Sequence, residues 1–464
     1  MNITIPKEYD FLSRFFRLAF INVLSNITEP LVGTISIAFL GHFTQIEDLA
    51  GVTLSTMLFN HLYFIVNCLR MGTTGVTAQA VGRDDTEQML LVGLRNGLIG
   101  LGIAGLILLL QYPLQQLWFG IISAAPEVKA SGIDYFNARI WGAPAVVMNF
   151  VLIGWFLGRE MSSCVLLMSV VGNGANILFD YLFIVRWDLA SKGAGLSQAI
   201  SPYLMLVVGI ILASFQINWK EALSVARKVW DVSAFKAAFT LNGNIFIRSV
   251  ATMLVATIFT VLGSGMGTTI LAENALLLQV VLLGIYCFEA IGFATETLSG
   301  NFKGQQAIEK LFPLLQVTVG RSLEVGISCA LVCFLFPQTV FGLLTNYEEV
   351  TSLLTSYVPW LFPVLGFSSV YLILDGYFAG LALGQVLRNA SLISVIFGFV
   401  PVSVVAWYYQ NNHILWLAVS VWAATRMVML AVQVPGTLKD LSHTQEPFDL
   451  SSGNEAQSTS QILP

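Results

Sequence analysis

The sequence predicts an all-α membrane protein, with twelve transmembrane helices in two six-helix lobes related by a pseudo-twofold axis along the membrane normal. Three observations lead to this prediction: the composition, several long windows without charge, and an internal repeat. Of the 464 residues, 56% are hydrophobic and only 11% are charged, whereas a soluble domain carries about 25% charged residues. A chain of this length has too little polar surface for a water-soluble fold.

Windows without any Asp, Glu, Lys or Arg are long enough to cross a bilayer. They are 96–126, 161–179, 193–219, 249–272 and 389–425. A transmembrane helix needs about 20 predominantly apolar residues, and its backbone polar groups must be satisfied within the segment. Helices are favoured over barrel strands because the apolar runs are continuous rather than alternating.

The apolar segments predict six spans in each half of the chain. Those of the first half are 14–41, 48–80, 90–112, 128–157, 161–185 and 193–217. Those of the second half are 234–262, 269–300, 312–337, 350–380, 386–409 and 413–436. Charge-free windows cover most of the third, fifth, sixth and eleventh spans and about half of the seventh and twelfth.

Polar segments divide the chain into domains. Residues 1–217 are expected to form an N-terminal lobe and 234–436 a C-terminal lobe, joined by a cytoplasmic linker at 218–233. Residues 437–464 are rich in Ser, Gln and Glu, a composition typical of a disordered tail. This tail is expected to lie in the cytoplasm.

The distribution of positive charge predicts the orientation in the membrane. With the N-terminus inside, fifteen Lys and Arg residues lie in inner segments or at inner helix ends, three in outer segments and four within spans. Cytoplasmic segments of membrane proteins carry the excess of Lys and Arg. Both termini are therefore expected in the cytoplasm, with the protein in a plasma, inner or organelle membrane.

An internal repeat has a period of 222 residues. The matching pairs are Leu40-Gly41 with Leu262-Gly263, Leu49-Ala50 with Leu271-Ala272, Gly82 with Gly304, Val128 with Val350, and Gly158 with Gly380. Six helices per half give both halves the same orientation, as in the parallel repeats of several transporters. Two such bundles leave a cleft between them, where alternating access can occur by rocking.

Placing an ionisable side chain within a membrane span costs free energy, so such residues are candidates for function. In the fifth span, Asn173, Asn176 and Asp180 have spacings of three and four and lie on one helix face. A carboxylate with two amides suits a proton or a small cation such as sodium. The alternative is that these groups only hydrogen-bond neighbouring helices to one another.

The first span contains a second acidic candidate, Glu29. Glu29 and Ser36 are seven residues apart and so share a helix face. A buried glutamate can take up a proton near neutral pH. The alternative is that Glu29 lies near an aqueous cleft and contributes only to helix packing.

The second half carries a further set of charged and polar residues within its spans. It consists of Arg248, Tyr286, Glu289, Glu296 and Asp375. An arginine within a membrane should pair with a carboxylate, and Glu289 is the first candidate partner for Arg248. These residues are predicted to form a substrate site or polar site, or alternatively a structural ion pair.

Several motifs together resemble the multidrug and toxic compound extrusion (MATE) family. They are 30–42, 69–75 (Leu-Arg-Met-Gly-Thr-Thr-Gly), 139–144, 154–158, 176–180 and Asp375-Gly376. The resemblance covers residues 10–435 in order. The 69–75 block, 241–248 and the Arg388-Asn389 pair are most similar to the DinF-like branch of that family.

The resemblance implies two six-helix lobes and proton- or sodium-driven export of amphipathic, often cationic compounds. Asp180 and Asn176 match the family's ion-binding positions, so sodium could bind there, and Asp375 matches an acidic family position. Ser36 departs from the pattern, because the family usually has Asp at that position. We hypothesise that Glu29 replaces this missing carboxylate; alternatively, coupling has moved to Glu289, Glu296 and Asp375.

We therefore expect a cation-coupled antiporter that exports small amphipathic or cationic organic compounds by alternating access, with a proton favoured over sodium. It is expected to be a monomer in the bilayer, with no cofactor beyond the ion gradient, no other metal and no nucleic acid partner. One alternative is a flippase or exporter of a lipid-like or anionic metabolite. A membrane-embedded transferase is more remote, because His61 is the only His well inside a span.

Overall fold

The computed structural model describes residues 6–342 and 354–443, except for the side chains of Glu29 and His443. Over these residues the protein is helical and contains no strand. Twelve helical segments in this part of the chain are long and apolar enough to cross a membrane. The protein is therefore an all-α, multi-pass membrane protein, as the sequence predicts.

The helices of the N-terminal lobe follow one another with short connections. They are α1 (Leu12–Phe43), α2 (Ile46–Val66), α3 (Cys68–Gly82), α4 (Thr86–Leu109), α5 (Gln111–Ile121), α6 (Pro126–Arg139), α7 (Ala143–Gly158), α8 (Ser162–Asp180) and α9 (Ala190–Gln216). The short helix α10 (Trp219–Ala226) lies in the segment expected to be the linker.

The helices of the C-terminal lobe follow the linker. They are α11 (Val232–Gly265), α12 (Thr268–Gly304), α13 (Leu311–Leu335), α14 (Pro337–Gly342), α16 (Leu361–Gly380), α17 (Gly384–Ile393), α18 (Val400–Tyr409), α19 (Asn412–Ala431) and α20 (Gln433–His443).

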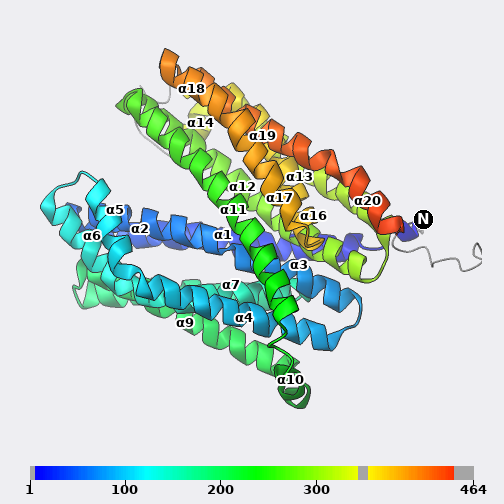
Figure 1. Ribbon diagram of the computed structural model, residues 1–464. Helices are drawn as coiled ribbons and strands as arrows, with labels where there is room; N and C mark the ends of the chain where they lie inside the picture. Colours follow the sequence, from blue (N-terminus) through cyan, green and yellow to red (C-terminus); the bar gives the residue numbers. More distant parts are fainter. Residues whose placement is uncertain (1–5, 343–353, 444–464) are drawn as a thin grey trace, which may run out of the picture.

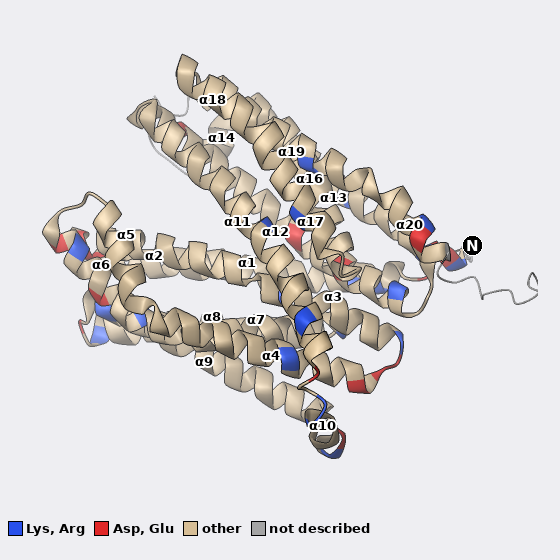
Figure 2. Cartoon of the chain, in the orientation of Figure 1, with Lys and Arg blue, Asp and Glu red and all other residues tan. Residues whose placement is uncertain are grey.

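The two lobes form a V. They diverge toward the end that carries α5 and α18 and approach each other at the end where the chain begins (Figure 1). Figure 2 shows most Lys, Arg, Asp and Glu residues at the ends of the helices, with long central stretches free of charge. Such a distribution places the costly charged groups at the two membrane surfaces.

Two predicted spans are interrupted within the membrane. The second is divided between α2 and α3 at Asn67, whose side-chain oxygen accepts a hydrogen bond from Nε of Arg70 at 3.2 Å. The fourth is divided between α6 and α7 by a 3-10 turn at Ile140–Gly142. Pro144 follows this turn, and it has no N–H to continue an α-helical hydrogen-bond ladder.

The second lobe differs from the prediction at two places. The tenth span begins at Val358 rather than at residue 350; residues 350–353 of the predicted span lie outside the described residues. The predicted disordered tail is helical at its start, because α20 continues to His443. Leu438 and Leu441 on α20 pack against the hydrophobic core, which explains why this polar segment is ordered. The rest of the predicted tail, 444–464, lies outside the described residues.

Close packing of backbones joins the lobes at their narrow end. A Cβ atom at Gly75 on α3 would clash with the carbonyl oxygen of Ala379 on α16, and one at Gly304 on α12 would clash with that of Gln79 on α3. Small residues allow transmembrane helices to approach in this way. The contact between the lobes therefore depends on glycine at these two positions.

Candidate functional site

A polar cluster lies inside the N-terminal lobe, where α1, α8 and α9 meet. The hydroxyl of Ser36 on α1 donates to the carboxylate of Asp180 on α8 and lies 3.4 Å from Oδ1 of Asn176. The amide nitrogen of Asn176 donates to Oγ of Ser197 on α9 at 2.8 Å. Nε2 of Gln198 donates to Oδ1 of Asn176 at 3.2 Å. We call these five residues the N-lobe cluster.

Asp180 is the electrostatic centre of the N-lobe cluster. Its side chain is fully buried, with 0% exposure. One carboxylate oxygen, Oδ1, has no hydrogen-bond partner, and the ion pairs formed by the described residues do not include Asp180. An isolated buried carboxylate is very unfavourable in its charged form, so it binds a proton or a cation. This site can therefore hold one exchangeable positive charge.

The helix geometry changes immediately after Asp180. The chain continues as a π-helix over Tyr181–Arg186, and a second π-helix occupies Ser394–Phe399 in the eleventh span. These π-helices therefore lie in the fifth span of each lobe. Such bulges are rare and occur frequently at functional sites.

The other predicted residues of the first lobe are placed differently. The amide nitrogen of Asn173 donates to the hydroxyl of Thr28 on α1 at 2.8 Å, so Asn173 joins α8 to α1 outside the N-lobe cluster. Glu29 lies in α1, but its side chain is outside the described part of the structure. The hypothesis that Glu29 replaces the missing carboxylate therefore stays a prediction.

A second cluster lies inside the C-terminal lobe. Nη2 of Arg248 on α11 lies 2.6 Å from Oδ2 of Asp375 on α16, and Nη2 of Arg426 on α19 lies 2.7 Å from the same oxygen. Nη1 of Arg426 also donates to the hydroxyl of Thr252 at 2.8 Å. We call Arg248, Asp375 and Arg426 the C-lobe cluster. Its charges are buried, with Arg426 at 0% and Asp375 at 2% exposure.

The C-lobe cluster corrects one expectation and adds one residue. Arg248 forms its ion pair with Asp375, whereas Glu289 was the first partner expected from the sequence. The charge of Glu289 nevertheless acts on Arg248 as well. The two residues are 127 positions apart, and only the packing of the helices shows that they meet. Arg426 is one of the four Lys and Arg residues that the charge count places within spans, and it was not assigned to a site.

A third buried contact connects the two lobes. Nη1 of Arg70 on α3 lies 3.3 Å from Oε2 of Glu296 on α12, and the two side chains are 6% and 1% exposed. The guanidinium carbon of Arg70 lies 3.9 Å from the centre of the Phe293 ring. Glu296 therefore belongs to this interlobe ion pair, apart from Asp375. Tyr286 also takes part in the lobe contact, because its carbonyl oxygen accepts a hydrogen bond from Asn26 on α1 at 3.3 Å.

Further hydrogen bonds cross between the lobes. Nη2 of Arg14 donates to Oδ1 of Asn301 at 3.1 Å, while its Nε donates to Glu160 at 3.0 Å. Nε2 of Gln79 donates to the carbonyl oxygen of Gly380 at 2.8 Å. These contacts and the glycine packing hold the lobes together at the narrow end of the V.

Two helical bundles that meet around buried charged groups define a membrane transporter of the two-lobe type. The chain belongs to the MatE family, whose model matches residues 22–182 and again 245–404, one segment in each lobe. This result confirms the resemblance inferred from the motifs.

Similar proteins support the same assignment. The chain is 29% identical over 418 residues to DNA damage-inducible protein F of Escherichia coli, covering 90% of each chain. It is 26% identical to Protein DETOXIFICATION 44, chloroplastic, of Arabidopsis thaliana, covering 77% of this chain and 70% of the relative. Among solved structures, the Vibrio cholerae MATE transporter VcmN in its bent form has a TM-score of 0.83 at 19% identity, covering 94% of this chain and 99% of the other. An outward-facing multidrug resistance MATE transporter has a TM-score of 0.82 at 17% identity, covering 94% and 96%.

Proposed function

We propose that the protein is a cation-coupled antiporter that exports small amphipathic or cationic organic compounds by alternating access. In this proposal it acts as a monomer, both termini lie in the cytoplasm, and the ion gradient provides the driving force. The observation that carries the proposal is the isolated, buried carboxylate of Asp180. A group of this kind can exchange a bound cation when the surrounding lobe becomes accessible to water.

A proton is favoured over sodium by the hydrogen bonds around Asp180. The side-chain amide of Asn176 already forms hydrogen bonds at both ends, because its Oδ1 accepts from Gln198 and its Nδ2 donates to Ser197. The unpartnered atom is Oδ1 of Asp180. Hard cations require several oxygen ligands, whereas a proton requires one. The hydroxyl of Ser36 can donate to the charged carboxylate or accept from the protonated one.

Alternating access requires that the contacts between the lobes break and re-form. With both termini in the cytoplasm, the contact of Arg70 with Glu296 and the glycine packing would close the cytoplasmic side. The V of the two lobes would then open toward the outside (Figure 1). Transport would proceed by rocking of the lobes to the opposite arrangement.

The test is efflux of a fluorescent organic cation from proteoliposomes, with pH and sodium gradients imposed separately. We expect Asp180→Asn to abolish efflux driven by a pH gradient, because an amide cannot exchange a proton. Glu127→Gln removes an exposed carboxylate at the start of α6 and is the matched control, with unchanged efflux. Normal pH-driven efflux in Asp180→Asn would contradict the proposal.

The same assay distinguishes Asp180 from Glu29 as the coupling group. If Asp180 acts with Ser36, then Ser36→Ala removes a hydrogen bond to a charged group, worth about 1.5–3 kcal/mol, and efflux should fall about tenfold or more. If Glu29 has replaced the family carboxylate, Glu29→Gln should abolish efflux while Ser36→Ala leaves it nearly intact. The two variants therefore give opposite results under the two hypotheses.

A second candidate function is export of an anionic or lipid-like compound. The observation that favours it is that two arginines share one oxygen of Asp375. Arg248 also lies near the other lobe, because its Nη1 is 3.8 Å from Sδ of Met71. Faster efflux of an anionic dye than of a cationic dye, with that preference lost in Arg248→Gln, would support this candidate. A preference for the cationic dye that Arg248→Gln does not change would exclude it.

A further inference from the structure

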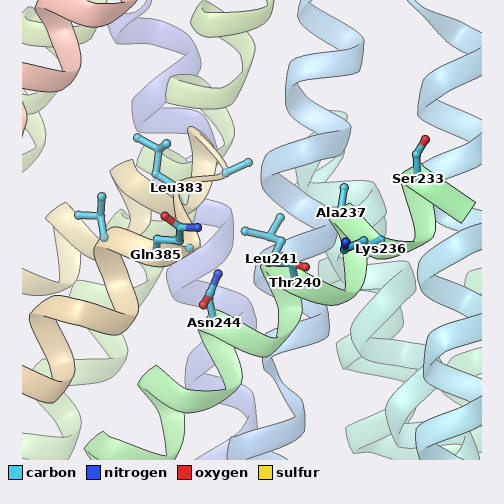
Figure 3. Close-up of a pocket in the computed structure, with 11 residues that line it drawn as sticks. Ser233, Lys236, Ala237, Thr240, Leu241, Asn244, Leu383 and Gln385 are labelled. Atoms are coloured by element: carbon cyan, nitrogen blue, oxygen red, sulfur yellow. The ribbon is translucent and has the colours of Figure 1, made fainter.

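A cavity of about 550 Å³ lies between the first turns of α11 and the loop that joins α16 to α17. Figure 3 shows Lys236 and Thr240 on α11 and Gln385 across from them on the other wall. Asn244, also on α11, completes the polar part of the lining. The cavity lies within the C-terminal lobe, and neither the N-lobe nor the C-lobe cluster contributes to its lining.

The charge of this cavity is positive. Its lining contains one lysine and no carboxylate. Among the ion pairs of the described residues, Lys236 has no partner. A second cation lies beside the wall, because Nη1 of Arg388 donates to Oδ1 of Asn244 at 3.0 Å. The cavity therefore presents an uncompensated ammonium group and several hydrogen-bond donors, which together suit an anion.

Asp231 is the carboxylate nearest to Lys236 in the sequence, and it already accepts hydrogen bonds at the start of α11. Asp231 precedes α11 and accepts hydrogen bonds from the backbone N–H groups of Ser233 and Ala234. The Ser233 hydroxyl, followed by these N–H groups, lowers the pKa of Asp231. Asp231 thus caps the helix as a charged acceptor. On the opposite wall, no side chain of the described residues caps the first turn of α17.

The surroundings of the cavity have the character of a membrane surface. Large apolar side chains near it are exposed: Trp230 is 74%, Val232 81% and Phe239 70% exposed. The membrane-spanning segment begins at Val232, so the cavity lies along its first turns. Tryptophan and lysine are enriched at this level of membrane helices, next to the lipid headgroups. The phosphate groups of the surrounding lipids are therefore expected at the same level.

We propose that this cavity binds the phosphate group of an anionic phospholipid. Lys236 contacts the phosphate oxygens, Thr240 and Gln385 donate hydrogen bonds, and the acyl chains follow the exposed apolar side chains of α11 into the bilayer. The lipid then connects α11 with the α16–α17 loop. Proximity to an anionic lipid surface is worth about 1 kcal/mol per lysine, so loss of Lys236 should weaken binding about fivefold.

The test measures lipid retained by purified full-length protein in native mass spectrometry, after exchange into nanodiscs with phosphatidylglycerol or phosphatidylcholine. We expect Lys236→Gln to reduce retained phosphatidylglycerol about fivefold, while Lys236→Arg retains it. Lys220→Gln, at an exposed lysine of α10 outside the cavity, is the control and should match wild type. Thermal unfolding of each variant checks that all of them are folded.

Three outcomes would overturn the proposal. One is equal retention of phosphatidylglycerol in Lys236→Gln and wild type. Another is an equal loss of phosphatidylglycerol and phosphatidylcholine, since recognition would then not depend on the anion. The third is that inorganic phosphate alone stabilises the protein against heat as strongly as phosphatidylglycerol does, with both effects lost in Lys236→Gln. In that case the occupant is a free anion rather than a lipid.

Discussion

Replacing Asp375 with Asn removes the carboxylate charge that Arg248 and Arg426 share. Both Nη2 atoms lie within 2.7 Å of the same oxygen, and Arg426 is completely buried. Removing one partner of a buried ion pair costs about 3–5 kcal/mol, because the other charge is left uncompensated. Asp375 pairs with both arginines, but the charge of Glu289 also acts on Arg248, so we expect a loss within this range, about 3–5 kcal/mol. That loss is a large part of the about 5–15 kcal/mol by which folded proteins are stable.

Chemical unfolding in mild detergent measures this loss, with tryptophan fluorescence as the signal. The signal comes from all ten tryptophans of the chain. One of them, Trp422, lies at the cluster, with the guanidinium carbon of Arg426 5.8 Å from its ring centre. The double variant Asp375→Asn with Arg426→Met also removes one of the two arginine charges that pair with Asp375 in wild type. We therefore expect it to recover part of the stability lost in Asp375→Asn alone, a non-additivity that a double-mutant cycle measures.

Asp180→Asn is the matched comparison in the other lobe. Asp180 forms no ion pair with the described residues, so its replacement should leave the free energy of unfolding unchanged or increase it. Two results would refute the reasoning about Asp375. One is a stability loss below about 1 kcal/mol, which is the range of exposed ion pairs. The other is a double variant whose loss equals the sum of the two single losses.

Two further predictions concern the contact between the lobes. Glu296→Gln removes the charge opposite Arg70, so the lobes should separate more often at this end. Alkylation of the nearby buried Cys68 should then become faster than in wild type. An unchanged alkylation rate would argue against a role of the ion pair in holding the lobes together. Gly75→Leu should lower efflux strongly, because a side chain there meets the backbone of Ala379. Gly243→Leu is its control, since a Cβ at Gly243 has no neighbour within 4 Å; equal efflux in both variants would contradict the role assigned to Gly75.

The spans could be predicted because a bilayer imposes a length and an apolar composition that are visible in the sequence. Interruptions inside a span were harder to see. Asn67 is one of several polar residues in the predicted second span, and nothing local marks it as the point of interruption. Its hydrogen bond with Arg70 is seen only in the structure. The order of α20 was also missed, because Leu438 and Leu441 are few among polar neighbours and their partners come from elsewhere in the fold.

The candidate sites could be predicted only where their residues are close together in the sequence. Asp180 and Asn176 lie on one helix face, and local periodicity is enough to place them together. Ser197 and Gln198 join them from α9. These two residues could not be recognised beforehand, because serine and glutamine also join membrane helices without any further role. Pairings across long separations, such as Arg248 with Asp375, require the tertiary structure.

The three buried carboxylates of these sites differ in what compensates their charge. Asp375 has two arginines and Glu296 has one. An arginine stays protonated in a protein. Each of these two carboxylates is therefore paired with a permanent cation, which is part of the protein and occupies the place where an exchangeable ion would otherwise bind. Among the described residues, the hydroxyl of Ser36 donates to one oxygen of Asp180, no Lys or Arg forms an ion pair with it, and its other oxygen has no hydrogen-bond partner. A coupling site must lose and regain its cation in every cycle, and a fixed guanidinium opposes that exchange. This difference supports Asp180 as the proposed coupling group and assigns Asp375 and Glu296 to holding helices and lobes together.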